Sequence, residues 1–571
     1  MGDGSGLKDK IWLSAGVLAA VGAVAMPVLN PDLYWHLSAG KYLTANLGLP
    51  SSDFLSWTEY GTGWTDFEWL AQLLYYAGYS LAGISGLFVL KMLLLSAVFP
   101  AFYLFLADAG LSWLAFFALP LWGLVVMPNS DLRPENFSVL FFAMLLLRLE
   151  RARVSGRPWP SSPAGFIGLA LFFALWANLH AGFAYGLLLL ASYSAGAWAD
   201  SRLWPSGPSA GGTAAGAGAA AAFIGSTLNP WGFGLYGILY RHAADSAALS
   251  RYLSEWAPPS LSNPWHWPFM ALLAASLLLL LRRFLKERSL PLAQLLCLGW
   301  LALEASRHTR QIVFFGLAAV VFSLDSAVKL WEPGLLARRG KVLLVLCLAY
   351  LALLVWPRYL SFRSSIGAEA SGAAAYLKSE ASVLGGRRLY NPWTWGGYLG
   401  WALAPEYRVF TDGRYLFHKY LVPVSEAMRD QDAWDRFAAE KGFDIVIFRR
   451  DYSMLPYMQR AGKASVTVRR PSYLIFMPEN KWALLYWDAF SVVFGRRGRP
   501  LPPEFRFLRP DDEESLKLAL CSGTLKADAV SGELARYYAA AAGAHSTREA
   551  DLFRLWLAGY PGACATLNRG Q

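Results

Sequence analysis

Apolar runs of the length that crosses a lipid bilayer recur through the first two-thirds of this chain, and they constrain its fold more than any other feature. A helix needs roughly 17 to 25 apolar residues to cross about 30 Å of hydrocarbon. We identify about eleven such runs, several of them short, near 11–29, 84–106, 112–127, 137–148, 164–179, 181–198, 213–228, 267–281, 290–305, 311–326 and 342–357. The pattern predicts a mainly α-helical, polytopic membrane bundle.

Composition agrees with a protein that lies in lipid. Hydrophobic residues make up 55% of the chain and charged residues 16%, and the mean hydropathy is +0.33, which is more apolar than an ordinary soluble protein. The net charge of +11 is concentrated in loops that meet anionic head groups, so it does not indicate a nucleic-acid partner. The chain has no Walker A loop, Gly-rich dinucleotide fingerprint or Cys/His zinc spacing, and soluble nucleotide donors and structural zinc are therefore not indicated.

Positive charge indicates the orientation, because short cytoplasmic loops of membrane proteins hold an excess of Lys and Arg. With eleven spans, four basic clusters fall on one side. They are Lys8 with Lys10; Arg148, Arg151, Arg153 and Arg157; Arg282, Arg283, Lys286 and Arg288; and Lys329, Arg338, Arg339 and Lys341. We therefore expect a multi-pass protein of a bacterial inner membrane, with a cytoplasmic N-terminus and an extracytoplasmic region after Arg358.

The same pattern divides the chain into a membrane module, 1–357, which includes an outer loop at 30–83, and an extracytoplasmic domain, 358–571. The second region alternates a helix-like run at 368–377 with strand-like runs at 388–390, 407–410 and 443–448, and its tail from Leu516 is helical. This alternation predicts an α/β domain. Cys521 and Cys564 lie in it, and an exported compartment permits a disulfide between them.

The outer loop from Asn30 to Gly83 is acidic and has Lys41 as its one Lys or Arg. Apolar residues recur near helical spacing over 32–48 and 66–82, which predicts two amphipathic helices along the outer membrane surface. Asp32 follows Asn30-Pro31 at the mouth of the first span, and His36 shares its helical face. Asp32 is either a helix N-cap or a general base or metal ligand. The functional alternative arises because a carboxylate at that depth is energetically costly unless it forms an ion pair or has a catalytic role.

A basic motif lies on the side where positive charge is disfavoured. It is Ser306-Arg307-His308-Thr309-Arg310-Gln311. Arg307, His308 and Arg310 are candidates for binding a phosphate or diphosphate, since Arg offers planar bidentate donors. The alternative is a cluster that extends its charges to the head groups.

Smaller outer motifs add further candidates. The loop after the third span offers Asp131, Arg133 and Glu135, and a tight turn in Asn178–Gly182 holds His180, which is either a structural or a functional histidine. The loop that contains Glu255 and Trp256 is interpreted as part of an interfacial aromatic belt.

Aromatic and glycine residues crowd one turn of the exported domain, 391–399, which contains Trp393, Trp395, Gly396, Gly397 and Tyr398 and is followed by Thr411-Asp412-Gly413-Arg414. The aromatic rings of this turn either present their faces to a ligand such as a sugar or pack in the core beneath the tight turn.

In layout the chain resembles the polytopic glycosyltransferases of the GT-C fold, which include oligosaccharyltransferase catalytic subunits, protein O-mannosyltransferases and the aminoarabinose transferase of lipid A. The shared features are the long first outer loop, the acid at the outer end of the first span and the exported C-terminal domain. The segment 393–398 looks like the WWDYG signature of oligosaccharyltransferases but lacks its Asp. Asp131 and Glu135 correspond, at wider spacing, to the acidic motif of their second loop.

The resemblance implies an inverting membrane enzyme that takes a sugar from a polyprenyl-phosphate-linked donor, with a glycan, lipid or protein as acceptor. It implies that Asp32 is catalytic or binds a metal; no cofactor is certain, but Asp32, Asp131 and Glu135 are candidate ligands for Mg²⁺ or Mn²⁺.

The chemistry assigns roles to the same residues. Transfer needs a carboxylate to deprotonate the acceptor hydroxyl and cations to neutralise the departing phosphate. Asp32 is the expected base, and Arg307 and Arg310 form the clamp. His36, Glu68 and His180 orient the substrate. We expect Asp32 and Arg307 to face one cavity, with a gap on the order of 8–15 Å that leaves room for a sugar phosphate, wider than an ion pair.

Two other classes of function stay open. A flippase or transporter of lipid-linked sugars predicts charges at mid-span and repeated halves, whereas the polar residues here gather at the outer boundary and no repeat is found. A membrane scaffold predicts an exported domain that binds glycan or peptide without catalysis.

Topology gives a direct test. Single cysteines in place of Tyr60 and Tyr420 should react with an impermeant maleimide added outside the cell, and a cysteine in place of Ser155 should not, because positive charge retains that loop in the cytoplasm. Labelling at 155 from outside would contradict the orientation.

Overall fold

A computed structural model describes residues 3–203, 212–289, 291–357, 366–450, 454–461 and 464–540, together with 551, 554, 555, 557–559 and 564. The chain forms two compact units. The membrane unit contains Met1–Asn30, Ala39–Ser51 and Thr65–Arg363, and the C-terminal unit contains Pro31–Ser38, Ser52–Trp64 and Ser364–Gln571. Parts of the first loop therefore group with the C-terminal unit. The sequence analysis had assigned this loop to the membrane module instead. The expected boundary at Arg358 lies outside the described residues.

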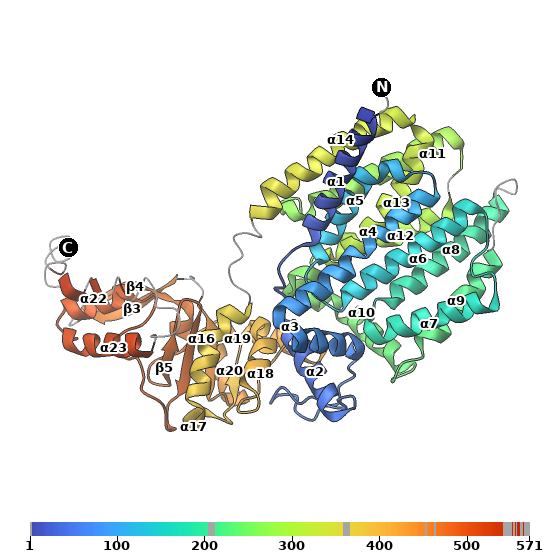
Figure 1. Ribbon diagram of the computed structural model, residues 1–571. Helices are drawn as coiled ribbons and strands as arrows, with labels where there is room; N and C mark the ends of the chain where they lie inside the picture. Colours follow the sequence, from blue (N-terminus) through green and yellow to red (C-terminus); the bar gives the residue numbers. More distant parts are fainter. Residues whose placement is uncertain are drawn as a thin grey trace. The chain divides into compact units, whose positions relative to one another are not determined.

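The membrane unit is a bundle of helices (Figure 1). In chain order these are α1 (Asp3–Val24), α2 (Leu33–Asn46, shared with the C-terminal unit), α3 (Trp69–Ser96), α4 (Val98–Asp108), α5 (Ala115–Val126), α6 (Glu135–Ser155), α7 (Pro163–Leu179), α8 (Phe183–Leu203), α9 (Gly212–Ser226), α10 (Gly234–Tyr252), α11 (Trp267–Glu287), α12 (Leu292–Arg307), α13 (Ile312–Leu330) and α14 (Pro333–Tyr350).

A helix lies at every apolar run that the sequence analysis identified as a span. Within the described ranges, four segments are long and apolar enough to cross a membrane: Trp69–Asp108, Ser112–Asn129, Pro264–Glu287 and Thr309–Leu330. The predicted polytopic membrane fold is therefore supported, and the number of eleven spans stays a prediction.

The two helices expected in the first loop are present. The range 32–48 corresponds to α2 and 66–82 to the first part of α3. Helix α3 continues to Ser96 across a kink at Ala82 and Gly83, where Gly83 adopts φ 59°, a left-handed conformation that glycine tolerates. This kink separates the loop helix from the span predicted at 84–106. The location of both helices on the membrane surface stays a prediction.

Helices α5 and α13 form the centre of the bundle. The segments that contain them are 72% and 78% buried, whereas those that contain α3 and α11 are 22% buried. Small residues allow close contact: the Cα of Gly123 lies against Ala20, and that of Gly316 against Val125. Since apolar side chains gain little by leaving lipid for protein, close backbone packing of this kind holds membrane helices together.

A buried polar network joins the C-terminal ends of α6 and α13 to α11 and α12. Arg153 contacts Glu150 (2.8 Å) and Asp325 (2.9 Å), Arg283 contacts Asp325 (2.8 Å), and the amide of Gln294 donates to Glu150 (2.9 Å). The sequence analysis counted Arg153 and Arg283 as orientation signals. The charges of these two arginines are compensated by acids inside the bundle. The prediction of orientation therefore depends more on the exposed basic residues of the same loops.

The C-terminal unit contains a four-stranded sheet in the order β1-β2-β6-β5. Its strands are β1 (Leu389–Tyr390), β2 (Ile445–Arg449), β5 (Trp482–Trp487) and β6 (Ser491–Arg496). β1 pairs parallel to β2, and the other neighbours are antiparallel. A separate antiparallel hairpin is formed by β3 (Met454–Ala461) and β4 (Ala464–Pro471).

Alternate residues of the sheet belong to different hydrophobic cores. On β2, Ile445 and Ile447 pack in one core and Val446 and Phe448 in the other, so both faces are covered. The helices of this unit are α16 (Ile366–Ser379), α17 (Ala381–Leu384), α18 (Gly396–Leu403), α19 (Leu421–Ala427), α20 (Gln431–Lys441), α21 (Ser472–Phe476), α22 (Glu513–Cys521) and α23 (Ala527–Ala540).

The predicted α/β character and helical tail are present, with one difference. The run 407–410 is not a strand of the sheet; within it, Val409 forms a single parallel bridge to Ser56 of the first loop. The strands β3 to β6 were not predicted individually from the sequence.

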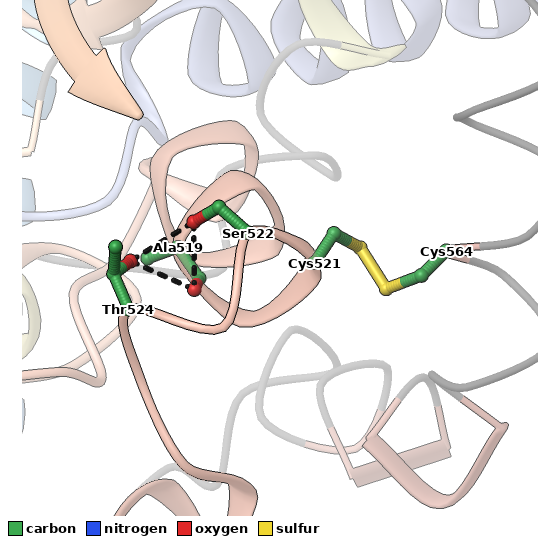
Figure 2. Close-up of a disulfide and its surroundings, with 5 residues drawn as sticks. All are labelled: Ala519, Cys521, Ser522, Thr524 and Cys564. Atoms are coloured by element: carbon green, nitrogen blue, oxygen red, sulfur yellow. Dashed lines mark hydrogen bonds between the residues drawn. A yellow bond between two sulfur atoms is a disulfide. The ribbon is translucent and has the colours of Figure 1, made fainter. Parts of the chain in front are cut away.

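Cys521 at the end of α22 forms a disulfide with Cys564 (Figure 2). The bond closes a segment with a sequence separation of 43 residues, and Cys297 and Cys347 are free and buried in the membrane unit. The disulfide that the sequence analysis allowed between these two cysteines is therefore present, and the export of the C-terminal unit stays a prediction.

The disulfide can be counted by thiol labelling. In the denatured, unreduced protein a mass-tagged maleimide should add to two cysteines, Cys297 and Cys347, and after reduction to all four. Four additions before reduction of protein taken from the native membrane would contradict the bond.

Candidate functional site

Asp32 lies one residue before helix α2, in the part of the chain that groups with the C-terminal unit. Its carboxylate packs against Gly413: a Cβ added to Gly413 would be 1.8 Å from Asp32 Oδ1 and 3.4 Å from Trp35 Nε1. An atom cannot approach another that closely, so any side chain at 413 would displace the carboxylate or itself. Asp32 and the motif Thr411–Arg414, which are far apart in sequence, therefore meet in one unit.

The two glycines of the aromatic turn also allow another chain segment to approach closely. A Cβ at Gly396 would be 1.8 Å from the carbonyl oxygen of Thr411, and one at Gly397 would be 2.7 Å from that of Pro31. The side chain of Asn391 ties the pieces together, since it donates to the Thr411 carbonyl (2.9 Å) and accepts from the Phe410 amide (2.8 Å). The turn thus packs directly against the segment that contacts Asp32.

The three aromatic candidates of this turn differ in what they contact. Trp395 is 1% exposed and belongs to the hydrophobic core, which agrees with the packing alternative for this residue. Tyr398 is half-buried and meets Tyr34 edge-on at 4.9 Å. Trp393 is half-buried and its ring stacks near His418 at 6.2 Å, so it retains exposed ring surface for a ligand.

His36 is buried, and its ring lies 3.6 Å from that of Trp35. It is therefore held one helical turn from Asp32, as the sequence predicted, and both residues belong to the C-terminal unit.

A second group of candidates forms in the membrane unit around Arg310. Its Nε donates to Glu135 (3.1 Å) and its Nη1 to Glu255 (3.2 Å), and Arg133 also pairs with Glu255. Asn129 donates to Glu135 (3.2 Å) and to the Arg310 carbonyl (3.1 Å). This group, named the Arg310 cluster, joins the N-terminal ends of α6 and α13 to the segment after α10.

Glu255 is the functional candidate that sequence reasoning missed, because it lies in a loop that reads as an aromatic belt. Burial opposes its charge, but Arg133 and Arg310 lower the pKa of Glu255 to about 2, so it stays ionised at physiological pH. The signal that was available is an acid between Ser254 and Trp256 in an otherwise aromatic outer loop.

The residues predicted to bind a phosphate differ in their contacts and in their exposure to solvent. His308 bonds through Nδ1 to the Trp256 carbonyl (2.8 Å), and Thr309 bonds through its hydroxyl to the Glu255 carbonyl (2.9 Å); both anchor the Glu255 segment. Arg307 has a side chain that is 60% exposed and lies 3.8 Å from Glu304 on its own helix. Arg310 is thus paired with acidic side chains, whereas the side chain of Arg307 is exposed to solvent.

His180 is held in a defined tautomer. Its Nδ1 accepts from the Gly182 amide (3.0 Å) and contacts the Ser138 hydroxyl (2.7 Å), which itself accepts from Trp176 Nε1 (2.7 Å). We therefore assign the proton to Nε2, which faces Glu68 at 3.8 Å. Burial and the positive charges of Arg310 and His242 hold the pKa of His180 well below its usual range, so His180 is neutral.

Asp131 and Glu135 are engaged by protein groups. Asp131 accepts from the Leu29 amide (3.0 Å) and thereby fixes the chain just before Asn30, whose side chain donates to the Leu132 carbonyl (3.1 Å). Within the described residues, no group of three or more His, Cys, Asp or Glu side chains is arranged to hold a metal ion. The metal-ligand role of Asp32, Asp131 and Glu135 stays a prediction, with Asp32 in a different unit from the other two.

Comparison with solved structures identifies the fold. The archaeal oligosaccharyltransferase AglB from Archaeoglobus fulgidus, in complex with an inhibitory peptide and a dolichol-phosphate, matches with a TM-score of 0.53 and 13% identity, over 77% of this chain and 69% of that chain. This chain has the fold of that membrane glycosyltransferase. The resemblance to the GT-C fold, stated above from layout, is confirmed.

A second structure, ArnT from Cupriavidus metallidurans bound to undecaprenyl phosphate, matches with a TM-score of 0.44 and 13% identity, over 86% of this chain and 99% of that chain. No protein-family model and no curated protein matched the chain. At 13% identity the match to AglB shows a shared fold, and the role of each residue rests on the geometry of this chain.

The Arg310 cluster gives a test that separates structure from ligand binding. Arg310→Gln removes the cation paired with the buried carboxylate of Glu135 and leaves Glu255 paired with Arg133 alone, so we expect a loss of about 3 kcal/mol in stability, seen as a lower melting temperature in detergent. Arg307→Gln, on the same outer segment, should change stability by less than about 0.5 kcal/mol. Equal melting temperatures for the two variants would contradict the assignment.

Proposed function

We propose that this protein is a membrane glycosyltransferase that moves a sugar from a polyprenyl-phosphate-linked donor to an acceptor on the outer face of the membrane. The observation that carries the proposal is the half-buried position of Asp32 against Gly413, in a chain with the fold of a membrane oligosaccharyltransferase. A carboxylate placed this way at the end of the first span suits a general base.

In the proposed reaction Asp32 accepts the proton of the acceptor hydroxyl while that oxygen bonds to the anomeric carbon. The bond between this carbon and the donor phosphate oxygen breaks, and the lipid phosphate leaves with the electron pair. Attack from the side opposite to the leaving group inverts the anomeric configuration. Deprotonation of the hydroxyl and neutralisation of the phosphate are the two steps at which protein groups lower the barrier.

The phosphate is assigned to the basic residues of the 306–311 segment. Arg307 offers an exposed guanidinium, while Arg310, Arg133 and Glu255 hold the segment in place through ion pairs. Glu68, oriented by the neutral His180, and His36 beside Asp32 are proposed to bind the sugar hydroxyls. The shared cavity of Asp32 and Arg307 stays a prediction, because the two residues belong to different compact units.

Trp393 is the proposed contact for the acceptor, since its half-buried ring faces its neighbour His418 and leaves surface for stacking. Trp395 and Tyr398 support it, the first from within the core. The acceptor is a glycan, lipid or protein hydroxyl or amide; the turn lacks the Asp of the oligosaccharyltransferase signature.

Asp32→Asn tests the proposal in purified protein. With a panel of synthetic polyprenyl-phosphate sugars as donors and release of polyprenyl phosphate as the measurement, turnover should fall at least about 1,000-fold, because the amide cannot accept the proton. Binding of undecaprenyl phosphate should change less than about twofold.

Asp432→Asn is the matched control, an exposed acid of helix α20 in the same unit, and should keep full turnover. Wild-type protein that binds the lipid phosphate but releases none from any donor would favour the transporter or scaffold alternatives. Asp32→Asn protein with full turnover would contradict the role of Asp32.

A further inference from the structure

Three charged residues form a buried ion cluster on either side of Gly413. The guanidinium of Arg414 binds both oxygens of Asp412, with Nη2 to Oδ2 at 2.7 Å, and its Nη2 also binds Asp53 at 2.6 Å. All three side chains are at most 1% exposed. We name Asp53, Asp412 and Arg414 the clasp.

The clasp is held at both ends. Asp53 also accepts from the amides of Leu55 (3.3 Å) and Ser56 (3.0 Å) and from the Ser56 hydroxyl (2.6 Å). Arg414 packs with its guanidinium carbon 4.6 Å from the ring of Trp64. Although burial opposes the charge of Arg414, Asp412 and Asp53 raise its pKa, so the guanidinium stays charged. Burial raises the pKa of Asp412, and the charge of Arg414 opposes that rise.

Stability alone does not account for such a cluster. Moving charges out of water costs about as much as their attraction returns, and apolar residues of similar volume often stabilise a protein at least as well. A bidentate ion pair does, however, constrain the relative orientation of its two groups. Here it fixes residues 412 and 414, and therefore the backbone of Gly413 between them, to within the tolerance of a hydrogen bond.

The backbone that the clasp fixes is the one that contacts Asp32. The absent side chain of Gly413 leaves the space that Asp32 Oδ1 fills, and Trp35 Nε1 lies beside the same space. This indole N–H is buried and has no hydrogen-bond partner among the described residues. A buried donor without a protein partner is uncommon, and its place beside Asp32 suits an oxygen of the substrate.

We propose that Gly413 and the clasp are positioning residues that hold the carboxylate of Asp32 in its reactive orientation, with the indole N–H of Trp35 directed to the acceptor oxygen. The C-terminal unit is then part of the reaction centre and not an accessory domain. Asp53 links the first outer loop to this function from within the same unit. The inference rests on the proposed function, in which Asp32 is the base.

Gly413→Ala tests the positioning directly, because the added methyl group enters the space of the Asp32 carboxylate. We expect kcat to fall at least about 100-fold while KM for the lipid donor changes less than about twofold, since the ground-state contacts of the phosphate are unaffected. Gly400→Ala is the matched control: a Cβ at this position would lie 3.8 Å and 3.9 Å from the two methyl groups of Val409, which is ordinary contact, so kcat should stay within about twofold.

A double-mutant cycle separates positioning from a general structural effect. If Gly413→Ala acts through Asp32, it should lower the residual turnover of Asp32→Asn by less than about twofold. Full turnover in Gly413→Ala, or a further loss of about 100-fold in the double variant, would overturn the inference. The proposed function fails separately, if Asp32→Asn itself keeps full turnover.

Asp53→Asn provides a second variant should Gly413→Ala fold poorly. Asparagine keeps an acceptor for Arg414 but removes one charge of the clasp, so we expect a fall of about tenfold in kcat with KM unchanged. The control is Glu59→Gln, an acid of the same loop that binds Lys419 (2.8 Å) and Tyr420 (2.6 Å) and lies outside the clasp. Equal kcat in the two variants would contradict a role of the clasp in positioning.

Discussion

The buried guanidinium of Arg414 is the interaction on which the rest of the C-terminal unit's candidate site depends. It binds Asp412 in its own segment and Asp53 in the first loop, which are separated by most of the chain. Around this link the loop forms backbone bonds to the domain, with Trp57 N donating to Val409 O at 3.0 Å and Val409 N to Leu55 O at 3.2 Å. A loop that would otherwise be long and mobile is thereby given a fixed conformation.

Glycine makes this arrangement sterically possible. Gly396, Gly397 and Gly413 each lie where another chain segment approaches closer than a Cβ allows, and none of them has the left-handed φ that usually explains a glycine in a turn. The aromatic turn therefore has two functions in one sequence. Its glycines allow the close approach of Thr411 and Pro31, and its Trp393 is half-buried beside His418.

Charge is arranged differently in the membrane unit, where two groups of paired ions lie at opposite ends of helices α6 and α13. The Arg310 cluster lies at the N-terminal ends of α6 and α13, and the Glu150 network lies at their C-terminal ends. Between them the two helices are apolar and packed, so the low-dielectric interior contains few uncompensated charges. Arg307 differs from these ions, because its side chain is 60% exposed and lies 3.8 Å from Glu304 on its own helix.

The sequence by itself determined the elements whose signal is local. Apolar runs gave the membrane helices, helical spacing gave α2 and the start of α3, and the acid after Asn30-Pro31 marked Asp32, because length, period and position are properties of a short segment. Only the tertiary structure decided that Asp32 meets Gly413, that Asp53 pairs with Arg414, that Glu255 joins Arg310, and that Trp395 is core while Trp393 is not. These contacts join residues far apart in the chain, by 55 positions for Glu255 and Arg310 and by hundreds for the others, and the sequence of either partner carries no information about the other until the chain has folded.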